Sequence, residues 1–293
     1  MQSSSVKFTL LMIFAMLLWG GGWSALKIST ESVGVEVLTF WRFTIMTIAF
    51  IPVLFFFKEP LKLPRKSLKY IAMSSILNIL FMLFAYLGVK YSTAGSGGVI
   101  ITILSPLFTF LLSLVILKHV HTKIQYIGLG IGLVGGIIML DIQNIEWSNF
   151  LYSGEPYFIL AAITWAFITL ASQRSHTHIN PVHYSFFISA ISTIILLILT
   201  LSHDISIVFE QDSRFWIALL YLGIFAQTVA TTTFFVASGR LGSSRASSFM
   251  FLVPLFALVV SYLLLDEAIQ MHIVLGGTIS LIAVYFINKK VRV

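Results

Sequence analysis

The sequence predicts an all-α integral membrane protein with ten transmembrane helices, arranged as two inverted five-helix repeats. Composition is the first observation behind this prediction. Of the 293 residues, 58% are hydrophobic and only 10% are charged, whereas a soluble domain carries about 25% charged residues. The mean hydropathy is +0.98. A water-soluble fold of this size does not bury so much apolar surface, so the chain is expected to lie in a lipid bilayer.

Long apolar runs are the second observation. A helix needs about 20 mainly apolar residues to cross the hydrocarbon core. The run after Lys7 has no clear cleavage site, so it is interpreted as the first span and not as a removed signal peptide. The alternation typical of β-barrel strands is absent. The predicted spans are 7–27, 35–57, 68–89, 95–117, 124–141, 154–173, 182–202, 215–237, 244–265 and 270–288.

The charges of the connecting loops orient these spans. With the N-terminus inside, 14 of the 18 Lys and Arg residues fall on the inner side, and ten of the eleven acids fall outside. Because cytoplasmic loops are enriched in Lys and Arg, both termini are expected in the cytoplasm, with the chain in the cytoplasmic (inner) membrane of a prokaryote. The net charge of +7 then reflects topology, and nucleic-acid binding is not expected.

An internal repeat is the third observation. At an offset of 148, Pro106 aligns with Pro254 and Gly128 with Gly276, and at an offset of 146 Trp19 aligns with Trp165. The repeats are predicted to cover residues 1–145 and 146–293. Because each holds five helices, an odd number, the two must insert with opposite orientations. Inverted repeats are typical of secondary transporters, whose substrate site lies near the membrane midplane.

Each repeat also carries a proline near the middle of its fourth span. A proline removes a helical hydrogen bond and frees a carbonyl four residues earlier, here near Thr102 and Met250. Such groups persist at membrane depth where protein covers them or where they line a wet cavity. We expect Pro106 and Pro254 to act as hinges or cavity walls. Simple packing kinks are the alternative.

These segments resemble a known family. "GRLGSSRASSFMFLVPLFALVVSYLLLDEAIQMHIVLGGTISLIAVYF" and its first-half counterpart "GVKYSTAGSGGVIITILSPLFTFLLSLVILKHVHTKIQYIGLGIGLVGG" are similar to the drug/metabolite transporter (DMT) superfamily, in its two-copy EamA type. "LLWGGGWSALKI" and "FWRFTIMTIAF" resemble the first two helices of that family. The resemblance implies transport of amino acids and related metabolites. Lys118-His119 departs from the Gly-Glu-like pair that the family usually has, which Asp266-Glu267 approximates.

Arg42 is the one clearly embedded charge among the predicted spans. Ionisable residues are costly inside a membrane and are candidates for function. Its planar donor fork suits a carboxylate or phosphate, although a snorkelling side chain at the outer interface is an equal alternative. The spans hold no acid that would bind a cationic drug or relay protons, which favours a neutral, zwitterionic or anionic substrate.

Polar and aromatic residues at mid-depth complete the candidate site. Trp23 is expected in the outer aromatic belt, and His183 is expected to be a solvated histidine near the inner end of its span. Asn78 and Gln227 occupy nearly equivalent repeat positions, where they either bind substrate or join helices. The predicted substrate-binding residues are Trp19, Arg42, Asn78, Tyr86, Thr102, Trp165, Tyr184, Gln227, Thr231 and Ser248.

The leading functional hypothesis is a secondary transporter that moves a small polar metabolite by alternating access, with export as the expected direction. A multidrug or cation efflux transporter is the main alternative. An intramembrane enzyme lacks support from any HExxH motif or cysteine, and a channel lacks a Gly-rich filter segment. No catalytic residue, metal or cofactor is expected. The expected partners are a small-molecule substrate and the lipid bilayer, with a monomer as a plausible state.

Overall fold

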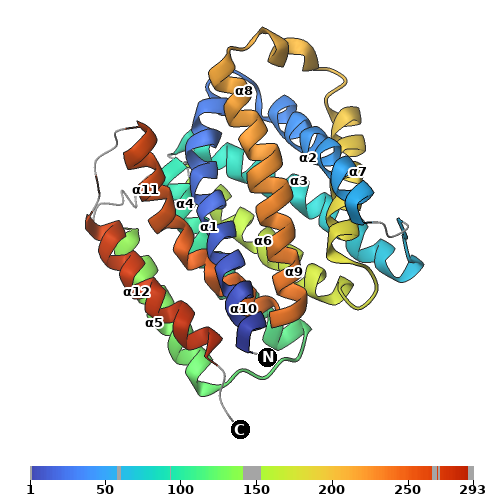
Figure 1. The fold of residues 1–293 in the computed structure, drawn as a ribbon. Coiled ribbons are helices and arrows are strands. Elements are labelled where there is room, and N and C mark those ends of the chain that lie inside the picture. Colours follow the sequence, from blue (N-terminus) through green and yellow to red (C-terminus); the bar gives the residue numbers. More distant parts are fainter. Residues whose placement is uncertain are drawn as a thin grey trace.

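The computed structural model describes residues 2–57, 61–92, 94–140, 153–265, 269 and 271–289, and every regular element in them is a helix. The helices form one bundle (Figure 1). In chain order they are α1 (Gln2–Thr30), α2 (Val35–Phe57), α3 (Leu68–Tyr91), α4 (Ala94–Ile116), α5 (Lys123–Met139), α6 (Glu155–Ser175), α7 (Pro181–Leu199), α8 (Ser213–Leu220), η5 (Tyr221–Thr231), α9 (Thr232–Leu241), α10 (Ser243–Ser248), η6 (Phe249–Leu252), α11 (Val253–Leu265) and α12 (Met271–Asn288), with the 3-10 turns η1 (Arg65–Ser67) and η4 (Ile205–Glu210) between them.

Ten spans are visible in the described residues, as predicted. Nine helical segments are long and apolar enough to cross a membrane, and α5 is a shorter apolar helix. The eighth span is α8, the π-helix η5 and α9 in series. The ninth is α10, the 3-10 turn η6 and α11. Gly242, with a φ of 90°, joins these two spans. A left-handed backbone of this kind favours glycine, which has no Cβ to clash.

The two halves of the bundle pack reciprocally. Helix α1 packs on η5 and α11 of the second half, and α6 packs on α3 and α4 of the first. The second helices of the two halves, α2 and α7, pack on each other, as do the fifth helices, α5 and α12. Thr47 and Thr193, whose hydroxyl oxygens are 3.3 Å apart, are separated by the repeat offset of 146. This pattern confirms two inverted repeats. The predicted boundary after residue 145 lies outside the described residues.

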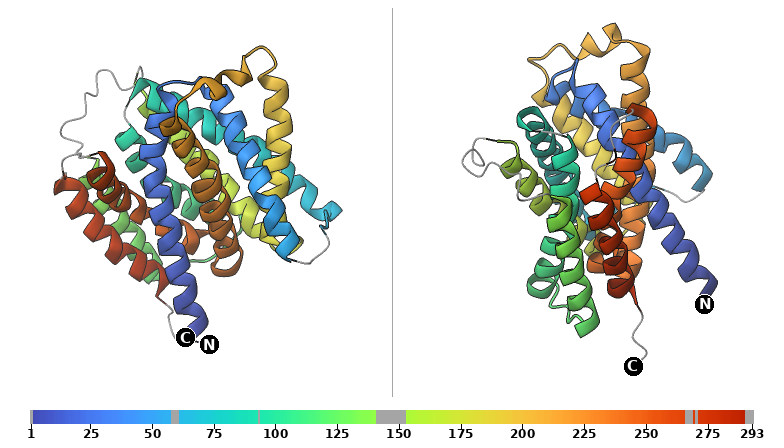
Figure 2. Two further views of the ribbon diagram at one scale, coloured as in Figure 1. Left: turned by 45° about the horizontal axis from the view of Figure 1, so that its top comes forward. Right: turned by 90° about the vertical axis from the view of Figure 1, so that its left-hand side faces the viewer.

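Small residues let α5 and α12 approach closely, side by side in both panels of Figure 2. A Cβ at Gly128 would lie 2.7 Å from Ile287, and a Cβ at Gly276 would lie 2.6 Å from Met139. These two contacts are equivalent under the repeat offset of 148. The glycines therefore serve packing within the chain, as small residues do between membrane helices.

A Gly276→Ala substitution is expected to destabilise the protein. The new Cβ would lie 2.3 Å from the carbonyl oxygen of Gly135, and a backbone atom cannot rotate away. Overpacking of this kind costs about 1–3 kcal/mol. Gly130→Ala on α5 is the matched control, because its Cβ meets nothing within 4 Å. Thermal unfolding in detergent should show a lower Tm for Gly276→Ala alone. Equal Tm values for both variants would contradict this packing.

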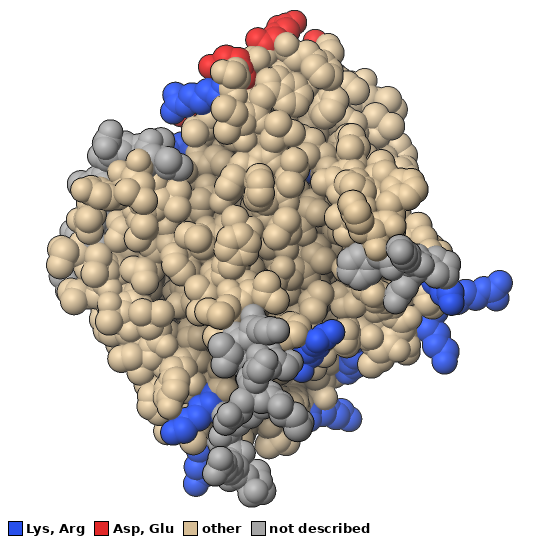
Figure 3. Space-filling view, in the orientation of Figure 1, with Lys and Arg blue, Asp and Glu red and all other residues tan. Residues whose placement is uncertain are grey.

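Charge separates the two ends of the bundle. The beginning of α1 and the end of α12 lie at one end, here named the terminus end (Figure 1). The six described acids lie at the opposite end, here named the acidic end. Acids on the face shown in Figure 3 gather at the top, and most Lys and Arg lie toward the bottom. The acids are Glu31, Glu36, Glu155, Asp204, Glu210 and Asp212.

This separation leads to a labelling prediction. The chain has no native cysteine, so a single introduced thiol reports its own location. Ser206→Cys at the acidic end and Thr177→Cys at the terminus end are both exposed positions. If the terminus end is cytoplasmic, an impermeant maleimide with access to the outer face of the membrane should label Ser206→Cys in intact cells and Thr177→Cys only after lysis. The reverse pattern would overturn the topology.

The two central prolines have different local structures. Pro106 lies inside α4, which runs without interruption from Ala94 to Ile116. Pro254 follows the 3-10 turn η6, in which the N–H of Val253 donates to the carbonyl of Met250. The carbonyl predicted to be freed by Pro254 therefore has a backbone donor. A 3-10 turn inside a helix often marks a hinge, so the hinge prediction concerns η6 more directly than α4.

Lys118 explains part of the departure from the family pattern. Its φ is 51°, the left-handed region in which glycine is most at ease. It occupies the position where the resemblance leads us to expect Gly. A left-handed residue at this turn is compatible with the glycine that the resemblance leads us to expect. Its counterpart at Asp266-Glu267 lies outside the described residues.

Candidate functional site

A cavity of about 80 Å³ lies between the two repeats. It takes residues from α1, α2, α3 and α4 of the first half and from α6, η5, η6 and α11 of the second. The residues from α2 and α4 belong to the first halves of helices that begin at the acidic end, and those from α3 belong to the second half of a helix that ends there. The cavity therefore lies from mid-depth toward the acidic end. Its lining includes seven of the ten predicted residues, namely Trp19, Arg42, Tyr86, Thr102, Trp165, Gln227 and Thr231.

Arg42 is the charged group of the cavity. Its side chain is 8% exposed, so it does not snorkel to the surface. Nη2 of Arg42 donates a hydrogen bond to Oε1 of Gln227 at 3.0 Å, across the interface between the repeats. Its Nε is buried and has no hydrogen-bond partner within the described part of the chain. Among the described residues, the hydrogen bond to Gln227 therefore holds the guanidinium, and Nε remains a donor for another group.

Tyr86 lies beside this guanidinium. Its hydroxyl lies close enough to the Arg42 guanidinium to interact with it electrostatically. The Tyr86 side chain is 1% exposed. Among the described residues the hydroxyl has no hydrogen-bond partner of good geometry. A phenolic O–H that is buried without a partner is costly. Arg42 and Tyr86 together present donors to the same region of the cavity.

Gln227 owes its position to an unusual helix. The segment η5 is a π-helix of 11 residues, and the hydroxyls of Thr228 and Thr231 donate to carbonyls five residues earlier. The carbonyl of Ala226 also accepts from Trp19 Nε1 at 3.0 Å. π-helical backbone is rare, and it occurs mostly as single-turn bulges inside α-helices, frequently at functional sites. The widened turn presents both a carbonyl and the Gln227 amide to the cavity.

Aromatic residues close the cavity toward the terminus end. Trp19 and Trp165, which the repeat aligns, meet edge to face with ring centroids 5.2 Å apart. Phe234 lies 5.2 Å from Trp19 and 5.6 Å from Trp165, and Phe81 lies 4.9 Å from Trp165. Such pairs add about 0.5–1.5 kcal/mol each beyond the area that they bury. Nε1 of Trp165 is buried without a partner among the described residues.

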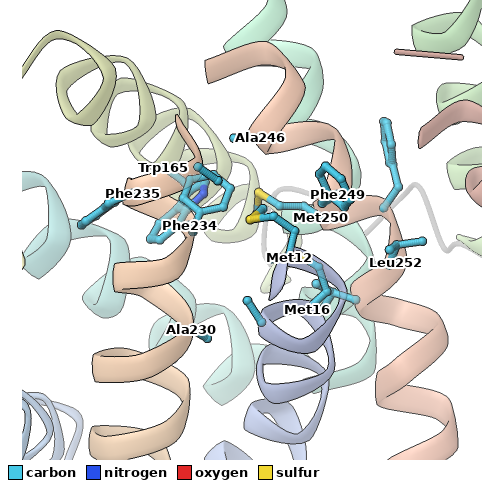
Figure 4. Packing of buried hydrophobic residues seen from close by; sticks show 14 of the residues in the cluster. Met12, Met16, Trp165, Ala230, Phe234, Phe235, Ala246, Phe249, Met250 and Leu252 are labelled. Carbon is cyan, nitrogen blue, oxygen red and sulfur yellow. The ribbon is translucent and has the colours of Figure 1, made fainter. Parts of the chain in front are cut away.

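Beyond these rings a packed core fills the bundle. Figure 4 shows the thioethers of Met12 and Met250 beside Trp165 and Phe234, with Phe249 on the far side. Methionine fills irregular gaps and makes favourable contacts with aromatic rings. Packing of this kind separates the cavity from the terminus end.

Hydrogen bonds join the helices at the terminus end. The hydroxyls of Ser172 and Ser238 are 2.7 Å apart, which joins α6 to α9. The hydroxyls of Ser113 and Ser244 are 3.0 Å apart, which joins the first repeat to the second. Arg174 donates to the last carbonyl of α4, that of Ile116, at 2.9 Å. These contacts hold the terminus end closed in this conformation.

Three predicted residues lie outside the cavity. Asn78 donates to the carbonyl of Ser74 in its own helix at 2.9 Å, and Tyr184 lies 2.6 Å from the Ser74 hydroxyl. Ser248 accepts from Nδ2 of Asn288 at 2.9 Å. All three are buried, and these contacts account for them as packing residues. Their predicted contact with a substrate has no support in the cavity lining.

Two further predictions were wrong. Trp23 lines the cavity and packs against all three apolar clusters, so it does not belong to an outer aromatic belt. His183 is 4% exposed and is not solvated, because the first turn of α7 packs into the bundle. The cavity also takes Phe81 and Met82 from α3. Nothing in the sequence distinguishes these two residues from the other apolar residues of that span.

Inverted repeats with a central cavity that is closed toward one end of the bundle are the architecture of a secondary transporter. A family model described as the EamA-like transporter family matches the chain twice, over residues 7–140 and 152–289. The chain belongs to this family of the DMT superfamily. It is a multi-pass membrane protein.

Relatives with this organisation are named as transporters. The chain is 23% identical to the uncharacterized transporter YoaV of Bacillus subtilis, covering 93% of both chains. It is 26% identical to an uncharacterized transporter of Archaeoglobus fulgidus, covering 97% of this chain and 98% of the relative. A solved crystal structure matches with a TM-score of 0.75 and 18% identity over 96% of both chains. That likeness shows the fold.

Proposed function

We propose that this transporter moves a small metabolite that carries a carboxylate, an amino acid or a related zwitterion or anion, by alternating access. One observation carries the proposal. Arg42 is buried in a cavity between the repeats, with Nε unpaired, and no Asp or Glu occurs among the described residues that line that cavity. A buried charge is costly unless it is paired. A carboxylate from the substrate would supply the missing partner.

The neighbouring groups suit such a ligand. Arg42 offers a planar donor fork, which matches the two oxygens of a carboxylate, and Tyr86 offers a hydroxyl beside it. Gln227 holds the guanidinium and orients it. The rings of Trp19, Trp23 and Phe81 supply an apolar wall for the body of the substrate. Cavities of this type, mostly apolar with a few placed polar groups, are typical of small-molecule sites.

The packing of the bundle supports alternating access. The cavity lies toward the acidic end, and aromatic rings, methionines and interhelical hydrogen bonds close the terminus end. Transport would require these contacts to open while the acidic end closes around the substrate. The reciprocal packing of the two repeats offers a second state of similar geometry, in which the two halves exchange their roles. Export is part of the proposal, with the family resemblance as its support.

A transporter of cationic drugs is the second candidate, and the cavity argues against it. A cationic substrate would meet the Arg42 charge, and the described lining has no carboxylate to offset the repulsion. At 4 Å, two unit charges at an effective dielectric of 20 interact with about 4 kcal/mol. Cation–π contacts with tryptophan supply about 2 kcal/mol. The repulsion from Arg42 thus exceeds the cation–π attraction for a cationic substrate, which favours an anion or a zwitterion.

A thermal-shift panel tests the substrate class. The purified protein should be heated with small carboxylates and with the matching amides, amines and alcohols. A ligand that binds the native state raises stability by mass action, by about 2.7 kcal/mol at 100 times its Kd. Some carboxylates should raise the Tm, and their amides should not. Stabilisation by amines or by neutral analogues with no carboxylate among the active compounds would contradict the proposal.

A further inference from the structure

A second pocket lies at the terminus end, away from the central cavity. It has a volume of about 530 Å³ and lies between the turn that joins α6 to α7 and the last turns of α9. Its lining comprises His176, His178, Ile179, Asn180, Pro181, Val182, Val236 and Arg240. None of these residues belongs to the proposed transport site, so the pocket needs a separate explanation.

The ionisable groups of the pocket are all basic among the described residues that line it. The Cζ atom of the Arg240 guanidinium lies 4.9 Å from the centroid of the Phe8 ring, and a guanidinium has five N–H donors with which it can bind a further partner. Nδ1 of His176 is buried and has no partner among the described residues. His178 is exposed and stacks on Tyr70, with ring centroids 6.3 Å apart. The pocket thus combines one permanent cation with two imidazoles.

The protein supplies no counter-ion for this cluster within its described residues. All six described acids lie at the acidic end, at the other end of the bundle. Lys69 lies close by, over the ring of Tyr70 at 4.9 Å, and it adds a further positive charge. Like charges gathered without a carboxylate repel one another unless an anion is bound.

The walls of the pocket are formed by close packing of α9 on His176 and by apolar side chains. A Cβ at Gly239 would lie 2.4 Å from Cγ of His176, so the glycine allows α9 to approach the imidazole. Asn180 is already engaged, because its Oδ1 accepts from the N–H of Val182 at 2.9 Å. The remaining walls, at Ile179, Val182 and Val236, are apolar. A ligand here would meet donors on one side and hydrocarbon on the other.

We infer that this pocket binds the phosphate group of an anionic membrane lipid. The guanidinium and the imidazoles would hold the phosphate oxygens, since Arg recognises phosphate through paired hydrogen bonds. The apolar wall would contact the first part of the acyl chains. Basic pockets between membrane helices on the cytoplasmic side bind lipid headgroups in this way. A soluble phosphate shares the headgroup chemistry but cannot use the apolar wall.

The test titrates three probes into the protein in a neutral detergent and follows the Tm. Phosphatidylglycerol carries both phosphate and chains, diacylglycerol carries the chains alone, and inorganic phosphate carries the anion alone. Phosphatidylglycerol should stabilise the wild-type protein most. Arg240→Gln should raise the half-saturating concentration of phosphatidylglycerol about tenfold, which is the effect of losing one charge-assisted contact. His178→Asn should also raise this concentration. Because His178 is exposed, this variant tests the pocket even if Arg240→Gln does not fold.

Arg65→Gln is the matched control, because Arg65 is an exposed arginine at the terminus end and outside the pocket. It should leave the lipid response unchanged. A loss in Arg65→Gln equal to that in Arg240→Gln would overturn the pocket in favour of diffuse surface charge. Equal stabilisation by diacylglycerol would show that the phosphate is not recognised. Stabilisation by inorganic phosphate with none by the lipid would overturn the lipid as the ligand.

Discussion

Arg42→Gln is expected to lose about tenfold to a hundredfold in affinity for a carboxylate substrate. A hydrogen bond to a charged group contributes about 1.5–3 kcal/mol, and about 1.4 kcal/mol corresponds to each factor of ten. The loss should be much smaller for the same compound with its carboxylate amidated. Arg42→Lys should recover only part of the affinity, because an ammonium lacks the bidentate fork. Binding is measured by thermal shift or by calorimetry on the purified protein.

The control for this variant is Arg214→Gln, which removes an exposed arginine at the acidic end and outside the cavity. It should bind the carboxylate as the wild-type protein does. Equal weakening of the carboxylate and its amide by Arg42→Gln would mean that Arg42 supports the packing of the cavity. No weakening of either compound would remove the main support for an anionic or zwitterionic substrate.

Replacing both Pro106 and Pro254 by alanine is expected to leave folding largely intact and to slow transport by about tenfold, which corresponds to a barrier about 1.4 kcal/mol higher. The physical reason lies mainly in η6. Alanine at 254 would restore an N–H that can bond the Met250 carbonyl, which now accepts from Val253. That change favours a regular helix in place of the 3-10 turn. Transport is measured as initial uptake into proteoliposomes.

The single variants separate the two prolines. Pro254→Ala should slow transport more than Pro106→Ala, since Pro106 lies within the uninterrupted helix α4. The Tm of each variant shows whether it is folded. A folded double variant that transports at the wild-type rate would make both prolines packing features.

The repeat made much of the architecture predictable from the sequence. Some residues that align at the repeat offset meet where the two halves pack on each other. Trp19 and Trp165 do so, with ring centroids 5.2 Å apart. Apolar length fixed the number of spans, because the bilayer sets a minimum for each helix. The position of Arg42 within a span left a buried and a snorkelling side chain as equal alternatives, and its 8% exposure decides for the buried one.

The finer geometry of the site was not predictable. A π-helix has the same apolar composition as an α-helix, so η5 gives no sequence signal, although it sets the direction of Gln227. Trp23 was assigned to the membrane interface from its depth alone, and the face of α1 that it occupies depends on tertiary packing. Asn78 finds its partner within its own helix, a bond that spacing along the chain does not distinguish from an interhelical one.

Counterflow in proteoliposomes tests the central claim most directly. Vesicles with the purified protein are loaded with an excess of an unlabelled carboxylate that stabilises it, and are diluted into a trace of the labelled compound. A carrier with one alternating site predicts transient accumulation of label above equilibrium, saturable by the unlabelled compound and strongly reduced in Arg42→Gln. Entry that rises linearly with concentration and never exceeds equilibrium, in the wild-type protein and the variant alike, would contradict the account.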